Sequence, residues 1–164
     1  SCPVVVVRED NHVTDSTKYG PVVVGVDGSE VSQKATAYAF REAQARGAAL
    51  IAVHTWMDMQ VQASLAGLSA AQSEWADIEK EQSELLTENL KEPREEYPEV
   101  EVKKLITRDR PVSALTEAAE GAQLLVVGSH GRGGFKGMLL GSTSRALLQS
   151  APCPMMVVRP DEES

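Results

Sequence analysis

Cysteine, aromatic side chains and long apolar runs are all scarce in this sequence of 164 residues. Its two cysteines, Cys2 and Cys153, are too few for a disulfide framework and do not stand in a spacing typical of a metal site. No apolar run approaches the ~20 residues of a membrane-spanning helix, and no signal-peptide pattern of charged, apolar and small residues opens the chain. We therefore expect a soluble, cytoplasmic protein with two reduced cysteines. The three histidines, His12, His54 and His130, lie far apart in the sequence, so we expect no metal site built by the protein alone.

Basic residues are also in deficit. Lysine and arginine number 16 against 24 aspartates and glutamates, which gives a formal net charge of −8. A face that binds nucleic acid or an anionic membrane needs a local surplus of cations. The charge balance therefore argues against both partners, and any bound polyanion must be small and held by a local site.

From residue 20 onward, short β-branched apolar runs alternate with longer amphipathic stretches, which is the pattern of a parallel sheet covered by helices. The predicted strands are residues 22–26, 50–55, 100–107, 124–127 and 155–159. The predicted helices are residues 30–46, 69–92, 112–120 and 142–149. Pro93 should end the second helix, and residues 56–68 should form a loop. We expect an α/β, doubly wound, five-stranded parallel sheet in the order 3-2-1-4-5, with a Rossmann-like fold.

One element is repeated. Residues 2–8 read CPVVVVR, and residues 153–159, the predicted closing strand, read CPMMVVR. A lone strand cannot bury its valines, so we expect residues 1–8 to be the closing strand of a preceding homologous domain. Residues 9–20 would then be a linker, residues 21–160 one whole domain and residues 161–164 a tail. Chance similarity of two valine-rich strands is the alternative.

Glycines are concentrated between residues 128 and 144, where an apolar strand leads toward a helix. We expect Gly128 and Gly131 to adopt positive φ, so that backbone N–H groups point at phosphate oxygens. Gly141 would allow a phosphate to approach the positive end of the last helix. The candidate side-chain ligands are the hydroxyls of Ser142, Thr143 and Ser144 and the cations of Arg132 and Lys136. The spacing of a P-loop is absent, and no GxGxxG opens the first helix. Ser142 as a simple N-cap is the alternative.

The spacing of Gly128, Gly131 and Gly141-Ser142, with two and nine intervening residues, resembles the ATP-binding signature of the universal stress protein family. The opening V-G-V-D-G-S of residues 24–29 resembles the family's first strand and turn, and the likeness extends over residues 21–160. It implies a fold of the adenine nucleotide alpha hydrolase type that binds ATP, with any Mg²⁺ carried in by the nucleotide.

The same resemblance implies where the nucleoside lies. Val26 and Asp27 would contact the base and ribose, the main chain of Thr55 would read the adenine edge, and Val127 would line the site. Ligands of open parallel sheets bind where the strand order reverses, here between the first and fourth strands, which supports this placement. The alternatives are an ordinary Asp-Gly turn for Asp27, a strand-end residue for Thr55, and structural roles for His54 and His130.

Three function classes remain: an ATP-binding regulator of stress response or growth, a slow ATPase, and a dimerising scaffold that needs no ligand. No carboxylate lies between Gly128 and Ser144, so the loop offers no general base for fast hydrolysis. The regulator is the favoured prediction.

The family resemblance also predicts a partner. Its members commonly dimerise through the fifth strand, so the partner would be the preceding domain or a second copy. We expect residues 4–7 to pair antiparallel with residues 156–158. This pairing would place the Cys2 and Cys153 sulfurs on the order of 15 Å apart, too far for a disulfide.

Overall fold

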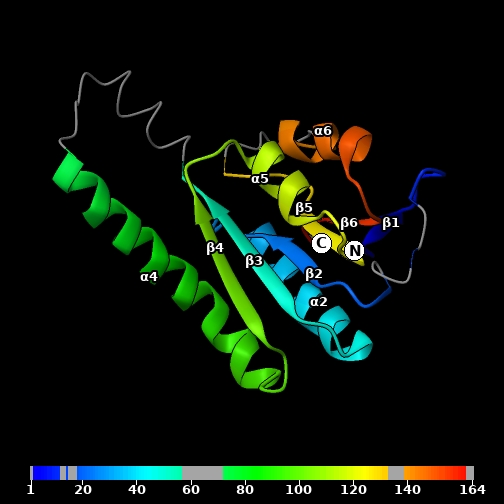
Figure 1. The fold of residues 1–164 in the computed structure, drawn as a ribbon, viewed down its shortest axis with the longest axis horizontal. Helices are drawn as coiled ribbons and strands as arrows, with labels where there is room; N and C mark the ends of the chain where they lie inside the picture. Colours follow the sequence, from blue (N-terminus) through cyan, green and yellow to red (C-terminus); the bar gives the residue numbers. More distant parts are fainter. Residues whose placement is uncertain (1, 12–13, 15–17, 57–71, 133–138, 162–164) are drawn as a thin grey trace.

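The computed structural model describes residues 2–11, 14, 18–56, 72–132 and 139–161 (Figure 1). The described part forms one mixed sheet of six strands, with helices on both faces. The strands are β1 (Val4–Val6), β2 (Val22–Gly25), β3 (Leu50–Thr55), β4 (Val102–Thr107), β5 (Leu124–Gly128) and β6 (Met155–Val158). The helices are α2 (Glu30–Arg46), α4 (Gln72–Glu96), α5 (Pro111–Ala118) and α6 (Ser142–Ser150).

The strand order is β1-β6-β5-β2-β3-β4. Strands β2 to β6 run parallel, and β1 is added antiparallel to the outer edge of β6. The prediction of a five-stranded, purely parallel sheet is therefore wrong, and the order of the whole sheet differs from the predicted one. The difference is the repeated amino-terminal strand β1. The prediction counted only the strands from residue 20 onward, whereas β1 pairs with β6 and is the sixth strand of the same sheet.

The core has two layers, one on each face of the sheet. Side chains of α2 and α4 pack on one face, and those of α5 and α6 pack on the other, with α2 and α5 on opposite faces in Figure 1. Strand β2 lies between β5 and β3, and Val22, Val23 and Val24 are fully buried. Burial on both faces is the reason for its continuous run of valines.

Helix α2 begins and ends where the sequence predicts. The Ser29 hydroxyl accepts a hydrogen bond from the backbone N–H of Ser32, which caps the first turn. Gly47 ends the helix with a left-handed φ of 61°. The residues buried between these caps share one face of the helix: Ser32, Ala35, Thr36, Ala39, Phe40 and Ala43.

Helix α4 differs from its prediction. It continues to Glu96, so Pro93 lies inside the helix and does not end it. Proline removes the donor that would bond the Asn89 carbonyl. The helix nevertheless continues past it, and the Pro93 carbonyl accepts from the Tyr97 N–H at 2.9 Å. Of the predicted loop at residues 56–68 only Trp56 is described, and the predicted helix start at 69–71 lies outside the described residues. Among the described helices, none is long and apolar enough to cross a membrane.

Strand β1 confirms the predicted antiparallel pairing. Its partners on β6 are Val157 for Val4, Met156 for Val5 and Met155 for Val6. Val7 lies beyond the strand, with 65% of its surface exposed. Both cysteines are free thiols, with Cys2 exposed and Cys153 buried. Burial raises the pKa of the Cys153 thiol to about 11, so this thiol is protonated and unreactive at neutral pH.

Candidate functional site

The predicted site residues meet at the carboxyl ends of β2, β3 and β5. Strand β2 has β5 on one side and β3 on the other. The chain adds β3 and β4 on one side of β2 and then β5 and β6 on the other, so the strand order reverses at β2. Asp27 follows β2, Thr55 ends β3 and Gly128 ends β5. Open parallel sheets bind their ligands at such a point, because the connections diverge there and leave a crevice.

The two carboxylate oxygens of Asp27 lie in different environments. Oδ1 accepts a hydrogen bond from the Ser29 backbone N–H at 2.8 Å, while the Asp27 backbone N–H donates to the Ser32 hydroxyl at 3.2 Å. These bonds and the φ of 80° at Gly28 make the turn into α2. Oδ2 faces Gly131, and a Cβ built on Gly131 would lie only 3.0 Å from it. The turn accounts for one oxygen and leaves the other directed toward the glycine-rich segment.

Gly128 and Gly131 do not have the backbone conformation that the sequence suggested. The glycines with positive φ among the described residues are Gly28, Gly47 and Gly121, so the predicted positive φ at Gly128 and Gly131 is wrong. Close approach is the reason for glycine at Gly128. A Cβ on Gly128 would lie 2.9 Å from Cγ1 of Val31 on α2, which allows the end of β5 to pack tightly against that helix.

Gly141 is the N-cap of α6 and has no side chain to cap it. Its backbone N–H donates to the Ser129 carbonyl at 2.7 Å. This hydrogen bond joins the start of α6 to the segment that follows β5. A Cβ on Gly141 would stand 3.5 Å from the Ser129 oxygen and 3.7 Å from the Gly131 nitrogen. The first N–H groups of α6 therefore have no side-chain cap and lie beside the Gly131 backbone. Ser142 is the first helical residue, so the alternative that it is the N-cap is wrong.

The three hydroxyls at the start of α6 lie in different environments. Ser142 is exposed and Thr143 is half-buried. Ser144 is 3% exposed, and its Oγ donates to the Gly128 carbonyl at 2.7 Å. Ser144 thus ties α6 to the end of β5, and its proton is already committed to that bond.

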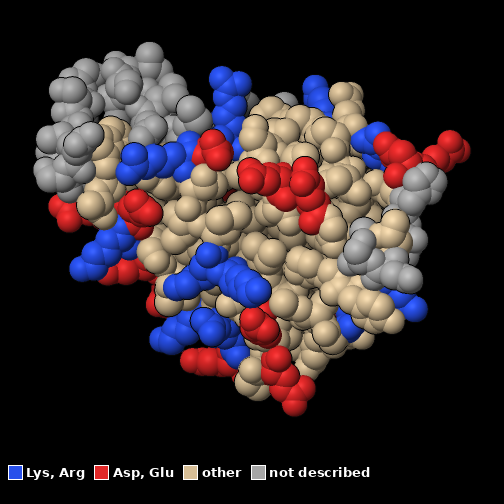
Figure 2. Space-filling view, in the orientation of Figure 1, with Lys and Arg blue, Asp and Glu red and all other residues tan. Residues whose placement is uncertain are grey.

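Arg132 lies over the turn that follows β2. Its Nε donates to the Asp27 carbonyl, and its Nη2 is 3.0 Å from the place that a Cβ of Gly28 would take. This exposed guanidinium is a local cation in a chain of net charge −8. Lys136, the other predicted cation, lies outside the described residues. On the face drawn in Figure 2, the coloured acidic and basic side chains are interspersed.

Sequence analysis missed a buried polar pair beneath the site. Nδ1 of His54 lies 2.7 Å from the Val26 carbonyl, and Nε2 lies 2.8 Å from Oε1 of Gln82 on α4. A signal for Gln82 was available, because it stands four residues from both Ile78 and Leu86 on the apolar stripe of α4. A polar residue on such a stripe needs a buried partner.

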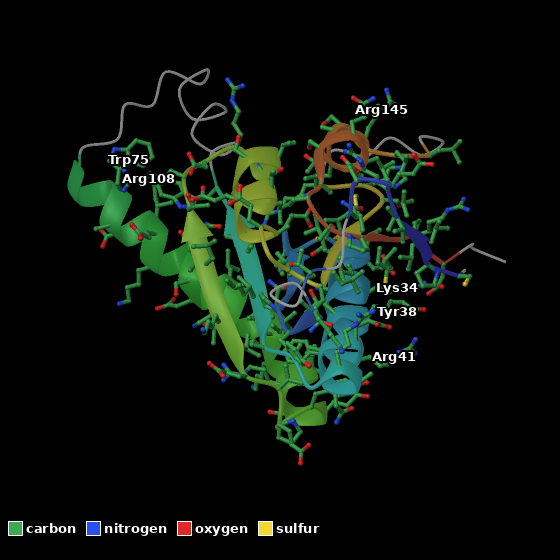
Figure 3. The ribbon with its side chains drawn as sticks, turned by 45° about the vertical axis from the view of Figure 1, so that its right-hand side comes forward. Lys34, Tyr38, Arg41, Trp75, Arg108 and Arg145 are labelled. Atoms are coloured by element: carbon green, nitrogen blue, oxygen red, sulfur yellow. The ribbon has the colours of Figure 1, made fainter. Side chains whose placement is uncertain are left out.

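A second cluster that sequence analysis missed lies just beyond Thr55. The Trp56 and Trp75 ring centroids are 5.7 Å apart, and the Arg108 guanidinium carbon lies 5.0 Å from the first and 5.9 Å from the second. Figure 3 shows Trp75 and Arg108 close together at the amino end of α4. These cation–π contacts hold α4 against the ends of β3 and β4. Their members are too far apart in the sequence for any local pattern to join them.

The site offers no group of three or more histidine, cysteine, aspartate or glutamate side chains that could hold a metal ion within the described ranges. Its chemistry is that of backbone N–H groups, one directed carboxylate oxygen and one cation. Backbone N–H groups at a helix start and a nearby cation are groups that bind small anions in proteins.

Comparisons with known proteins find relatives in both sequence and fold. A universal stress protein of Mycobacterium tuberculosis is 46% identical over 158 residues, which are 96% of this chain and 52% of that protein. A universal stress protein solved in complex with cAMP is 27% identical, with a TM-score of 0.58 over 85% of this chain and 96% of the other. One from Archaeoglobus fulgidus in complex with dAMP is 23% identical, with a TM-score of 0.60 over 85% and 98%.

The chain spans about half the length of the curated relatives it matches. The model of the universal stress protein family matches residues 18–159, which takes in every strand except β1 and all the described helices. The chain therefore belongs to the universal stress protein family.

Proposed function

We propose that the chain binds ATP at the carboxyl ends of β2, β3 and β5, and that it acts in the cytoplasm as a nucleotide-binding regulator of stress response or growth. The observation that carries this proposal is the start of α6, where Gly141 leaves uncapped N–H groups beside the Gly131 backbone. The relative in complex with cAMP supports an adenine nucleotide as the ligand class.

The nucleoside half of the ligand would lie over β2. Asp27 Oδ2 would accept hydrogen bonds from the ribose, and Val26 and Val127 would line the base with apolar surface. The main chain of Thr55 would read the adenine edge. Val26 and Val127 are each 4% exposed and belong to the core layers on opposite faces of the sheet, so each would contact the base only through its exposed edge at the carboxyl ends of the strands.

The phosphates would lie over the segment from Gly128 to Thr143. Backbone N–H groups near Gly131 and Gly141 would bind the oxygens, with the Ser142 and Thr143 hydroxyls and the Arg132 guanidinium adding hydrogen bonds. Binding requires Arg132 to exchange its bond to the Asp27 carbonyl for one to phosphate. Ser144 would act by fixing the Gly128 carbonyl to α6.

A slow ATPase and a scaffold that dimerises without ligand are the other candidates. Fast hydrolysis needs a base or a positioned water beside the last phosphate, and the segment from Gly128 to Ser144 has no carboxylate. Any Mg²⁺ would arrive with ATP. Calorimetric titration with ATP, followed by phosphate release over hours, separates the three: a regulator binds without turnover, an ATPase releases phosphate, and a scaffold does neither.

Replacing Asp27 by alanine should lower the affinities for ATP and for adenosine alike, by about ten-fold, because the lost hydrogen bonds go to the nucleoside. Asp27→Asn is the matched control, since the amide oxygen can still accept from the Ser29 N–H and keep the turn. Titration of each variant with both ligands decides. A loss confined to the triphosphate would place the carboxylate on a metal instead of the ribose.

The register of β1 supports a tandem arrangement of two such domains. The repeat aligns Val4, Val5 and Val6 with Met155, Met156 and Val157. In the sheet, Val5 pairs with Met156, its own counterpart, and Val4 pairs with Val157, the counterpart of Val6. A two-fold axis through the Val5–Met156 pair would produce this register. Residues 1–8 would then close a preceding homologous domain, whose own sheet covers the free edge of β1, or a second copy would do so.

Hydrogen exchange of the β1 amides tests this arrangement. In the chain of 164 residues, amides that point away from β6 should exchange fast, because an edge strand leaves alternate N–H groups unpaired. In the intact protein, all the amides of Val4, Val5 and Val6 should exchange slowly. Equal exchange in the two proteins would contradict the arrangement, and protection that rises with protein concentration would indicate a second copy.

A further inference from the structure

The ladder between β2 and β3 stops one hydrogen bond early. The Val26 N–H donates to the Val53 carbonyl at 2.8 Å, as a parallel ladder requires. The next bond would run from the Thr55 N–H to the Val26 carbonyl. Within the described residues that bond is missing, and the Val26 carbonyl accepts instead from Nδ1 of His54 at 2.7 Å.

The His54 ring is itself held in place. It is 5% exposed, and its other nitrogen, Nε2, meets Gln82, which is 1% exposed on α4. A carbonyl can only accept, so Nδ1 carries a proton. Nε2 then accepts from the Gln82 amide when the ring is neutral, or donates to its oxygen when the ring is charged. A glutamine side chain serves both states by turning its amide over.

We propose that His54, held by Gln82, is a positioning residue that keeps the Thr55 main chain unpaired so that it can read a purine edge. The N–H and C=O of one strand residue point to the same side. Because the Val26 carbonyl accepts from the imidazole and not from the Thr55 N–H, both groups of Thr55 face the position beyond the end of β2. This inference rests on the proposed function, because it assigns a cause to the reading of the base.

The arrangement also selects among purines. Adenine presents an acceptor, N1, beside a donor, its exocyclic amine, which matches an N–H beside a C=O. Guanine presents a donor at N1 beside an acceptor at O6, in the reverse order along the edge. Removing the His54 donor would free the Val26 carbonyl to pair with the Thr55 N–H. The ladder would gain one bond, and the adenine reader would be lost while the fold remained.

The test compares His54→Leu, Gln82→Leu and Gln82→Glu with a control, Gln123→Leu. Gln123 also bonds a backbone carbonyl, that of Gly20 at 2.7 Å, but it does so at the amino ends of the strands. Each variant is titrated with adenosine, guanosine and inorganic triphosphate, and its stability is measured by urea unfolding. Hydrogen exchange of the Thr55 amide is followed in the absence of ligand.

We expect His54→Leu to lower the affinity for adenosine by about thirty-fold and Gln82→Leu to lower it by about five- to ten-fold. The affinity for inorganic triphosphate should not change in either variant. Gln82→Glu should restore adenosine binding, because the carboxylate still holds the imidazole. Gln123→Leu should lower stability and leave adenosine affinity unchanged. The Thr55 amide should exchange fast in the parent protein and slowly in His54→Leu.

Adenosine affinity that stays unchanged in both His54→Leu and Gln82→Leu would overturn the inference. If His54→Leu does not fold, Gln82→Leu and its rescue by Gln82→Glu decide in its place. A parent protein that binds neither adenosine nor triphosphate would refute the proposed function instead. Exchange at Thr55 would then test the positioning alone, and equal rates in the parent and Gln82→Leu would overturn it.

Discussion

Replacing Gly141 by valine is expected to lower ATP affinity by about a hundred-fold or more, because one or two charge-assisted hydrogen bonds to phosphate are lost. The new Cβ would stand between the first turn of α6 and the backbone from Ser129 to Gly131, where a phosphate must approach. The fold should remain, since φ at Gly141 is −71° and a Cβ would make only ordinary contacts of 3.5 Å and more. Calorimetric titration measures the affinity.

Two controls accompany this variant. Gly141→Ala adds the Cβ without the branch and should give a smaller loss, and urea unfolding should show that neither variant loses more than about 1 kcal/mol. Adenosine should bind Gly141→Val almost normally, because the nucleoside lies away from α6. Near-normal ATP affinity in Gly141→Val would refute the role given to this glycine.

Replacing Gly20 by alanine is expected to cost at least about 3 kcal/mol of the free energy of unfolding, as overpacking against rigid backbone does. Gly20 precedes β2 and is buried, and a Cβ there would lie 1.9 Å from the carbonyl oxygen of Gly121. Relief would need backbone movement, which the bonds from Gln123 to Gly20 and Pro21 oppose. Urea unfolding measures the loss.

Gly47→Ala is the matched control. Gly47 also stands beside a strand of the sheet, at a φ of 61°, but nothing lies within 4 Å of the place its Cβ would take. The substitution should cost only the left-handed strain, about 1 kcal/mol. If Gly20→Ala cost no more than Gly47→Ala, the close packing at the amino ends of β2 and β5 would be contradicted.

Sequence alone predicted the elements whose cause is local. The valines of β2 are buried on both faces, so their continuous run identified a central strand. Ser29 and Gly47 mark the ends of α2 through their own backbone and side-chain chemistry. The pairing of β1 with β6 was predicted from the repeat of residues 2–8 in residues 153–159, where five of seven residues are identical, together with the resemblance to a family that dimerises through its fifth strand.

Features that depend on distant parts of the chain were beyond the sequence. Gly128 has no room for a side chain because Val31 of α2 packs against it. The glycine-rich local sequence suggested a positive φ at this position, which the structure does not have. Pro93 lies inside α4, although a proline often ends a helix, and its carbonyl accepts from the Tyr97 N–H. The His54–Gln82 pair joins residues 28 positions apart across a packed interface, and only the position of Gln82 on an apolar stripe gave any sign of it.

The central claim is that this chain binds ATP, and mass spectrometry of the small molecules released on denaturing the freshly purified protein tests it most directly. The account predicts ATP as the main nucleotide, in an amount that falls in Gly141→Val and stays unchanged in the control Gln123→Leu. Release of no adenine nucleotide, together with no heat when ATP is titrated into the emptied protein, would contradict it.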